Sequence, residues 1–429
     1  IKLENKPVDI PALSQIMPQA GCKVITTLQE TCESLVSGNV IVLLRGYKAA
    51  LSLPLTMFKQ RVVTEPENEK VARGPRDGFL ESIWVNIGML RSALINTDLR
   101  FETLNPGTRN NTLIGILYIE GLANEKIVEE VRIRLKRTNV DRLLATGYIQ
   151  DFITDSPWSP FPTSQITERP DQLVSALLNG RVGIMLDGTP IVGIVPVTFW
   201  EFFKAPDDYI EAPIPATLIR LLRLAAVFIT LILPGLYVAL TTFHIQMIPE
   251  SIAIIIAGSR IRTPLPTALE ILIAELLVEV LREASLRMPK VLGQTISIIG
   301  ALVIGDAATT TGIIGPFTVI VVAFTTLASF VIPSYNAALS IRILRFPLIL
   351  MSAAMGFFGL TLGAVFYLTH MVSLRSFGVP YMAPVAPWFF KDMRDLFVRL
   401  PWWLQVHRPT VYRPQDEIRV GQEQKPKPD

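Results

Sequence analysis

The run from Leu224 to Phe243 is twenty residues long and contains no Asp, Glu, Lys, Arg or His. A helix of about 20 apolar residues is long enough to cross the hydrocarbon core of a bilayer. Two further stretches share this property. Asp306 is the single charged residue between Val291 and Ile341, and Phe346 to Thr369 carries no charge at all. The chain is therefore predicted to cross a membrane several times.

The charged residues of the chain are concentrated in its first 213 and last fifty residues. The net charge of +3 is small, and no basic stretch is interleaved with aromatic residues, so we expect no nucleic-acid partner. Two cysteines, Cys22 and Cys32, exclude a disulfide framework. The chain has no zinc-ligand spacing, phosphate-binding glycine loop or nucleophile elbow. We therefore predict no catalytic, metal or cofactor site, and a protein that is not an enzyme.

The first 213 residues alternate strand-like and helix-like patterns, which predicts a soluble α/β region. Asp187-Gly188 between two β-prone runs is typical of a tight hairpin. The Pro-rich segment 156–162 is expected to divide this region into two small lobes, residues 1–156 and 157–213. The predicted helices cover 22–37, 80–96 and 124–137, and the predicted strands cover 39–44, 49–53, 113–119, 182–186 and 189–195.

Residues 214–373 are predicted to form an all-α polytopic membrane domain of four or five spans. Arg220 and Arg223 precede the first span, which by the positive-inside rule places the α/β region in the cytoplasm. Residues 374–429 form an interfacial or cytoplasmic C-terminal tail in which tryptophans lie beside arginines, so we expect it to follow the membrane interface. Four spans would place the tail in the cytoplasm and five would place it on the opposite side, and both counts remain open.

A helix predicted over 268–286 carries Glu275, Glu279 and Glu283 on one arc narrower than half its circumference. Glu283 has Arg287 four residues later, whereas Glu275 and Glu279 have no such partner. Two interpretations remain open. The helix lies at the interface with its charges in water, or it faces a polar lumen where a ring of glutamates would favour cations.

Asp306 lies between two apolar runs, in a segment rich in Gly and Thr. This segment is either a hairpin exposed at the membrane edge or the mouth of a pore. Gly356, Gly359 and Gly363 recur at spacings that allow helices to approach closely, so we expect them at helix contacts within a bundle or an oligomer.

Short strings spread along most of the chain resemble the A subunit of the GerA-type spore germinant receptors. In the α/β region they are Gly-Pro-Arg-Asp-Gly-Phe at 74–79, Ser-Pro-Phe-Pro at 159–162 and Thr-Glu-Arg-Pro-Asp at 167–171. In the membrane region they are Leu-Pro-Gly-Leu-Tyr-Val-Ala-Leu at 233–240, Leu-Arg-Glu-Ala at 281–284, Arg-Met-Pro at 287–289, Ser-Phe-Val-Ile-Pro-Ser-Tyr-Asn at 329–336 and Leu-Arg-Ser-Phe-Gly-Val-Pro-Tyr at 374–381.

This resemblance implies a multi-pass protein of the inner membrane of a bacterial endospore, with its N-terminal domain on the spore-core side. It implies a transporter-like B subunit that binds the nutrient and a lipoprotein C subunit as partners. It also implies a homo-oligomeric ring, a pentamer, that acts as a nutrient-gated ion channel and signals the start of germination.

Our leading hypothesis is an oligomeric ion channel lined by residues 291–312. Ile304, Asp306 and Thr309 would lie near its narrowest part, and Glu279 and Glu283 would shape its electrostatics. One alternative is a secondary transporter, because carboxylates in broken membrane helices also suit alternating access. The other is a signalling scaffold that the spans merely anchor.

Overall fold

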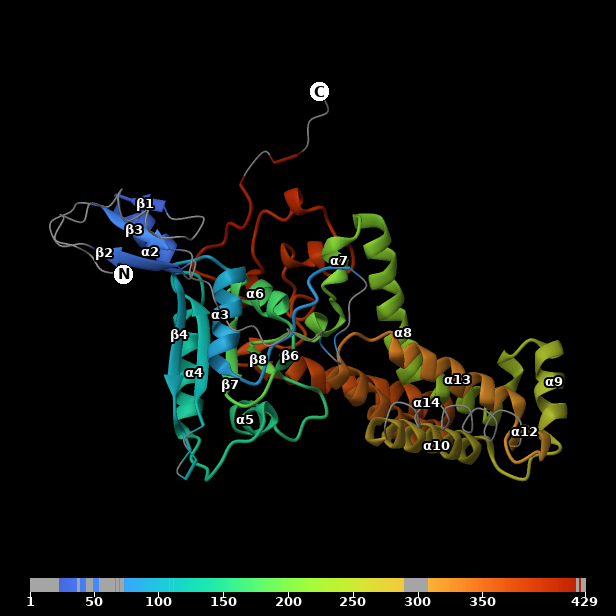
Figure 1. Ribbon diagram of the computed structural model, residues 1–429. Helices are drawn as coiled ribbons and strands as arrows, with labels where there is room; N and C mark the ends of the chain where they lie inside the picture. The colour runs from blue at the N-terminus through green and yellow to red at the C-terminus, as the bar shows by residue number, and fades with distance from the viewer. Residues whose placement is uncertain are drawn as a thin grey trace.

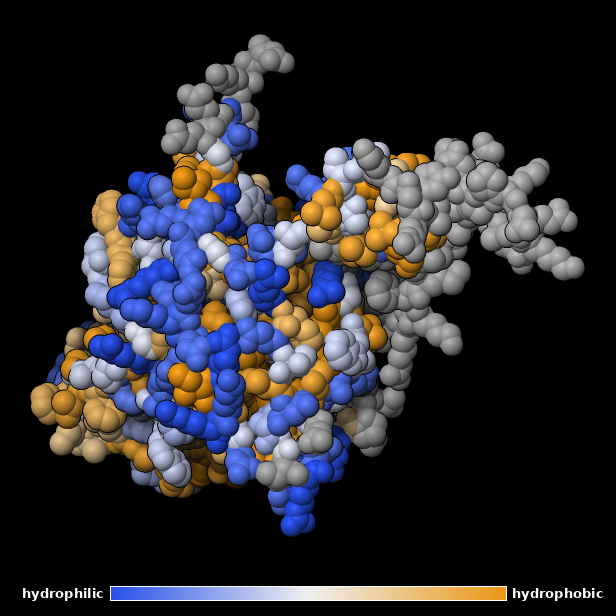
Figure 2. Space-filling model, turned by 90° about the vertical axis from the view of Figure 1, so that its left-hand side faces the viewer, coloured by the Kyte–Doolittle hydropathy of each residue, from blue (hydrophilic) through white to orange (hydrophobic). Residues whose placement is uncertain are grey.

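The computed structural model has an α/β region at one end and a helical region that extends away from it (Figure 1). Figure 2 looks at the α/β end, where the exposed face is mainly hydrophilic. The structure describes residues 23–36, 39–43, 49–53, 66, 69, 73–107, 109–110, 112–288, 308–421 and 424–425. The predicted pore residues Ile304 and Asp306 lie outside these ranges.

A small antiparallel sheet of strand order β1-β3-β2 forms the N-terminal part of the described chain, together with one helix, α2. The predicted strands at 39–44 and 49–53 are confirmed. Part of the predicted helix over 22–37 is instead an edge strand, β1. The elements are β1 (Lys23–Ile25), α2 (Leu28–Val36), β2 (Val40–Leu43) and β3 (Ala50–Leu53).

The main sheet has five antiparallel strands in the order β4-β5-β7-β8-β6. The strands are β4 (Leu99–Leu104), β5 (Ile114–Ile119), β6 (Gln165–Thr167), β7 (Val182–Leu186) and β8 (Val192–Val195). Strand β5 pairs with β7 in a register that sets Ile114 opposite Leu186. The boundary expected at 156/157 therefore falls within one sheet, because strands from both sides of it form one ladder. The separate small lobe is the sheet of residues 23–53.

Helices cover both faces of the main sheet. Side chains along a strand alternate between the two faces, and both faces of β5 carry apolar side chains that pack against helices. In β5, Ile114 and Ile116 pack on one face with α4 (Glu125–Arg137) and α5 (Thr146–Ile153). Leu117 and Ile119 pack on the other face with α3 (Ile83–Ala93) and α6 (Pro170–Leu178). The result is a three-layer α/β/α arrangement, which confirms the predicted fold class of this region.

Two local sequence signals form the predicted elements, and the second of them forms a longer loop than expected. The Asn124 side chain caps α4 by accepting a hydrogen bond of 3.0 Å from the Lys126 backbone N–H. Strands β7 and β8 form the predicted hairpin, and Gly188 has a positive φ of 93°. The first backbone pair beyond the turn is Met185 with Val192, so the loop is longer than a two-residue turn.

The helical region contains two helices that are long and apolar enough to cross a membrane, among the residues described: α8 and α14. A shorter apolar helix, α13, lies beside them. Large hydrophobic side chains are exposed along these helices, for example Phe228, Phe324 and Phe366, as expected of surfaces in contact with lipid. The helices are α7 (Asp207–Ile210), α8 (Pro213–Thr242), α9 (Glu250–Arg260), α10 (Thr267–Arg287), α12 (Ala308–Thr310), α13 (Pro316–Phe330) and α14 (Tyr335–Ser373).

Helix α14 is broken at Gly356, whose backbone angles are φ 61° and ψ −137°. The Tyr367 hydroxyl donates a hydrogen bond of 3.0 Å to the Leu344 carbonyl, so the two arms run back along each other. The uncharged stretch from Phe346 to Thr369 is therefore not one continuous span, as its composition suggested. It contains the turn of a helical hairpin, because glycine alone adopts such a backbone conformation without steric cost.

The C-terminal tail returns to the α/β region instead of leaving it. Phe377, Val379 and Tyr412 are buried in the core cluster that contains α4 and α5. The Trp402 ring lies 5.6 Å from that of Tyr209, at the end of α7. These tail residues therefore pack on the protein, and the path of the tail along a membrane interface stays a prediction. The short tail elements are β9 (Arg375–Ser376), β10 (Val379–Pro380), η4 (Asp392–Asp395), η5 (Trp402–Leu404) and η6 (Thr410–Tyr412).

Candidate functional site

Buried charges join α10 to the first arm of α14. The Glu275 carboxylate lies 2.7 Å from the Arg345 guanidinium, and the two side chains are 0% and 1% exposed. Arg345 also contacts Glu279 at 2.8 Å, and Arg342 contacts Glu279 at 3.2 Å. Ionised groups at such burial are retained only when they are paired. Arg282 of α10 lies 3.9 Å from Glu279 as well. We call Glu275, Glu279, Arg282, Arg342 and Arg345 the bundle network.

The spacing of these residues explains how they meet. Glu275 and Glu279 are four residues apart on α10, and Arg342 and Arg345 are three apart on α14, so each pair shares one helix face. The Thr325 hydroxyl of α13 donates a further hydrogen bond of 3.0 Å to Glu275. The partners that Glu275 and Glu279 lack four residues later on α10 are therefore supplied by α14.

A third carboxylate of α10 has a different partner. Glu270 is 1% exposed and accepts hydrogen bonds of 3.0 Å from the Gly315 backbone N–H and from the Thr318 hydroxyl. These donors belong to the first turn of α13, where unpaired backbone N–H groups and the helix dipole favour a negative charge. Glu270 thus caps α13 from a neighbouring helix.

The structure separates the other predicted site residues from the bundle network. Glu283 forms an exposed ion pair of 2.6 Å with Arg287. Thr309 lies in the short helix α12, just before the turn that leads to Gly315 and hence towards the Glu270 end of α10. Of the predicted pore residues in the described chain, Glu279 alone joins the bundle network.

The three predicted packing glycines lie in the α14 hairpin. Gly356 forms its turn. A β-carbon at Gly359 would collide with the Met351 carbonyl oxygen, and one at Gly363 would lie 2.5 Å from a methyl group of Leu348. These glycines are thus at contacts between the two arms of one chain.

A second buried network connects α8 to the α/β region and the tail. Asp208 is 1% exposed and lies 3.3 Å from Arg220 and 2.6 Å from Arg223. Arg220 also contacts Asp395 of the tail at 3.0 Å. Arg220 and Arg223 are the two arginines that precede the first predicted span, and the structure buries both in ion pairs.

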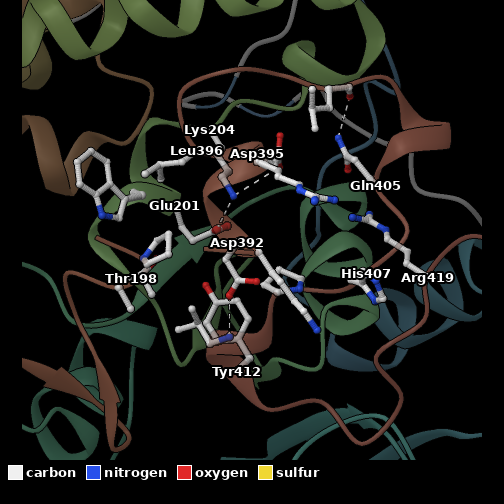
Figure 3. Close-up of a pocket in the computed structure, with 18 of the residues that line it drawn as sticks. Thr198, Glu201, Lys204, Asp392, Asp395, Leu396, Gln405, His407, Tyr412 and Arg419 are labelled. Atoms are coloured by element: carbon white, nitrogen blue, oxygen red, sulfur yellow. Dashed lines mark hydrogen bonds and ion pairs between the residues drawn. The ribbon is translucent and has the colours of Figure 1, made fainter. Parts of the chain in front are cut away.

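Lys204 extends this second network towards the sheet. Figure 3 shows its ammonium group between Glu201, at 2.8 Å, and Asp395, at 3.7 Å. We call Glu201, Lys204, Asp208, Arg220, Arg223 and Asp395 the junction network. The sequence shows these residues as scattered charges from 201 to 395. In the sequence, Arg220 and Arg223 before the first predicted span were the one feature that drew attention to this network.

Charges in the junction network hold one another ionised. Burial opposes the charged form of Lys204, but Glu201, Tyr209 and Asp395 outweigh it, so the pKa of Lys204 is raised. Burial likewise opposes ionisation of Asp395, but Lys204 and Arg220 outweigh it, so the pKa of Asp395 is lowered. The junction is therefore a set of salt bridges around neutral pH.

Further side-chain hydrogen bonds fasten the tail to the junction network. The Arg399 guanidinium donates hydrogen bonds of 3.1 Å to the carbonyls of Asp208 and Tyr209. The Tyr209 hydroxyl donates one of 2.6 Å to Asp395. These bonds hold the tail against α7, whose Asp208 is in turn paired with Arg220 and Arg223 of α8.

Among the described residues, no group of three or more His, Cys, Asp or Glu side chains is placed to hold a metal ion. The described chain instead carries its buried polar groups in ion-pair networks. Its distinguishing features are two buried charge networks, one inside the helical region and one where that region meets the α/β region.

Comparison with known proteins finds relatives over nearly the whole chain. Residues 2–411 match the family model described as Bacillus/Clostridium GerA spore germination protein. Spore germination protein KA of Bacillus subtilis (strain 168) is 42% identical over 416 residues, which are 97% of this chain and 76% of that protein. Spore germination protein B1 of the same organism is 40% identical, over 97% of this chain and 86% of its own length.

A solved structure is also similar in part. It is the N-terminal domain of the A subunit of the Bacillus megaterium spore germinant receptor GerK3, at 32% identity and a TM-score of 0.34, over 44% of this chain and 68% of that domain. The family match extends over nearly the whole sequence, through both the α/β and the helical region. The chain therefore belongs to the GerA family of spore germination proteins.

Proposed function

We propose that this chain is the A subunit of a nutrient germinant receptor in the spore inner membrane, with its α/β region on the core side. Copies of the chain form a ring, a pentamer, around an ion-conducting path. A transporter-like B subunit and a lipoprotein C subunit complete the receptor. Nutrient binding opens the path, and the resulting ion flux starts germination.

The observation that carries the proposal is the buried pair Glu275–Arg345 within apolar helices. Ionisable residues at membrane depth are costly, and proteins keep them where helices must hold a polar path or switch between two arrangements. Glu279 is paired with both Arg342 and Arg345. Its carboxylate would therefore stabilise the helices around the ion path and would not be an unpaired charge that lines the path. The path itself is assigned to residues 291–312, with Ile304, Asp306 and Thr309 at its narrowest part.

Ion flux into liposomes that contain the receptor with its partner subunits tests this assignment. We expect Ile304→Trp to reduce nutrient-triggered flux about tenfold or more, because a bulky ring closes a narrow pore. Asp306→Asn should lower the preference for cations over anions. Ile320→Trp is the matched control, because Ile320 is 63% exposed on α13 and faces away from the helix contacts.

Unchanged flux and ion preference in both variants would contradict the pore assignment. Loss of flux in the Ile320 variant as well would show that tryptophan substitution damages the bundle in general. Saturable, substrate-coupled uptake by a single copy would favour the transporter alternative. A sealed, non-conducting oligomer that still triggers germination would favour the scaffold.

A further inference from the structure

Helix α8 carries a stripe of exposed apolar side chains along one face. The stripe begins in the first turn with Ile214, which is 77% exposed, and continues to Phe228, which is 63% exposed. Its members recur three or four residues apart, so they share one side of the helix. We call this set the α8 stripe, and its residues are Ile214, Leu218, Leu221, Leu222, Ala225 and Phe228.

The polar side chains of the same turns all point into the protein. In residues 213–224 they belong to Thr217, Arg220 and Arg223. The Thr217 hydroxyl forms its two hydrogen bonds with backbone groups of the protein. Arg220 and Arg223 are buried on the opposite side of the helix, where both pair with Asp208. The α8 stripe is therefore an exposed face without any polar side chain.

Helix α8 is also longer than a perpendicular span requires. Its 30 residues extend about 45 Å, whereas the hydrocarbon core of a bilayer is about 30 Å thick. The uncharged run that is predicted to span begins at Leu224, so residues 213–223 precede it. Figure 1 shows this first part of α8 beside α7, beyond the bundle formed by α10, α13 and α14. A perpendicular α8 would expose the first half of the stripe to water, where a continuous apolar face is unfavourable.

The outward surface of the predicted span continues directly into the first half of the stripe. Phe228 lies within the uncharged run and is exposed, and Leu222 and Leu218 follow it towards the start of the helix on the same side. A helix with one apolar face and its polar groups on the other side suits the boundary between lipid head groups and acyl chains. Because the two surfaces are one uninterrupted face, the bilayer is the occupant that fits both.

We propose that the first part of α8, residues 213–223, is an in-plane membrane anchor. Its apolar face lies at the boundary between head groups and acyl chains in the leaflet nearest the α/β region, and its other face binds the junction network. This anchor rests on the membrane placement of the helical region that is proposed above. Because the same turns carry Arg220 and Arg223, the anchor would hold the junction network and the tail at a fixed height above the bilayer.

Collisions of a spin label with oxygen, which dissolves in lipid, and with a nickel chelate, which stays in water, test the anchor. The full chain with Cys22→Ser and Cys32→Ser carries one labelled cysteine and is placed as a single copy in each lipid nanodisc. We expect the label at Leu218→Cys to collide with oxygen and to lose its collisions with the nickel chelate, as the label at Phe228→Cys does. Ile95→Cys is the matched control, because Ile95 is 61% exposed in the α/β region and its label should collide with the nickel chelate.

Label depths along the stripe separate an in-plane helix from one that rises out of the bilayer. Labels at Ile214→Cys and Leu221→Cys should lie at nearly equal depth, whereas a perpendicular helix would separate them by about 10 Å. Nickel access at Leu218 with protection at Phe228 would overturn the anchor and leave the membrane placement of the helical region intact. Nickel access at both positions would overturn both. Protection of the Leu218 label from oxygen as well as nickel would show that protein covers the stripe, which would also overturn the anchor.

Discussion

At the scale of single residues, the partners of the buried charges decide what each charge does. Glu275 and Glu283 lie on the same arc of α10, yet Glu275 is fully buried against Arg345 and Glu283 is exposed beside Arg287. A buried carboxylate that loses its partner leaves an uncompensated charge, whereas an exposed one is solvated. The two glutamates therefore contribute differently to the free energy of unfolding, although both lie on the same arc of the helix in the sequence pattern.

This difference predicts the effect of two identical substitutions. Glu275→Gln should lower the free energy of unfolding by about 3 kcal/mol or more, because Arg345 remains buried with less compensation. Glu283→Gln should change the free energy of unfolding by about 1 kcal/mol or less. Denaturant unfolding in detergent micelles measures both. Equal losses would contradict the buried pair, and Arg345→Met combined with Glu275→Gln should recover part of the loss.

At the scale of elements, the α14 hairpin depends on glycines at two kinds of position. Gly356 supplies the positive φ of the turn, and Gly359 lets the returning arm approach the Met351 carbonyl. Gly258 on α9 is a helical glycine with open space around its α-carbon. The backbone geometry thus requires glycine at Gly356 and Gly359. Nothing in the described structure requires it at Gly258.

Alanine substitutions test this distinction. Gly359→Ala should destabilise the bundle by about 1–3 kcal/mol, because the added methyl group forces the two arms apart. Gly258→Ala should leave stability unchanged or raise it by about 1 kcal/mol, because alanine favours the helix. The midpoint of thermal unfolding measures both effects. A neutral Gly359→Ala would show that the arms do not pack as closely as the structure has them.

At the scale of the whole molecule, the tail is part of the folded core. Phe377, Val379, Val411 and Tyr412 complete the cluster beneath α4 and α5. The Ser376 hydroxyl donates a hydrogen bond of 2.7 Å to the Thr163 carbonyl and so ties the tail to the segment before β6. The α/β region, the first apolar helix and the tail therefore form one connected structure.

Truncation of the tail tests this connection. A chain that ends after Ser373 should lose cooperative thermal unfolding, because the apolar residues of the cluster become exposed to water. A chain that ends after Gly421 keeps all of these buried contacts and should unfold as the full chain does. Circular dichroism during heating measures both. Cooperative unfolding of the shorter chain at an unchanged midpoint would show that the tail is an accessory.

The predictions from sequence succeed or fail according to the range of the interaction involved. The helix capped by Asn124 and the hairpin at Asp187-Gly188 depend on neighbouring residues, and both were predicted. Strand β4 was missed, because its sequence LRFETL mixes charged and apolar residues and its pairing with β5 stabilises it. The ion pairs of Asp208 and Asp395 were missed because their partners are distant in sequence.

The sequence by itself determined that the chain has an α/β region followed by apolar helices, because run length and periodicity are local properties of the chain. It also showed that α10 is acidic. The tertiary structure alone decided that Arg342 and Arg345 neutralise Glu275 and Glu279, that α14 turns back at Gly356, and that the tail packs under the sheet. Each of these outcomes depends on which surfaces meet in three dimensions. The residue spacing within one segment does not specify which residues of another segment will pack against it or neutralise its charges.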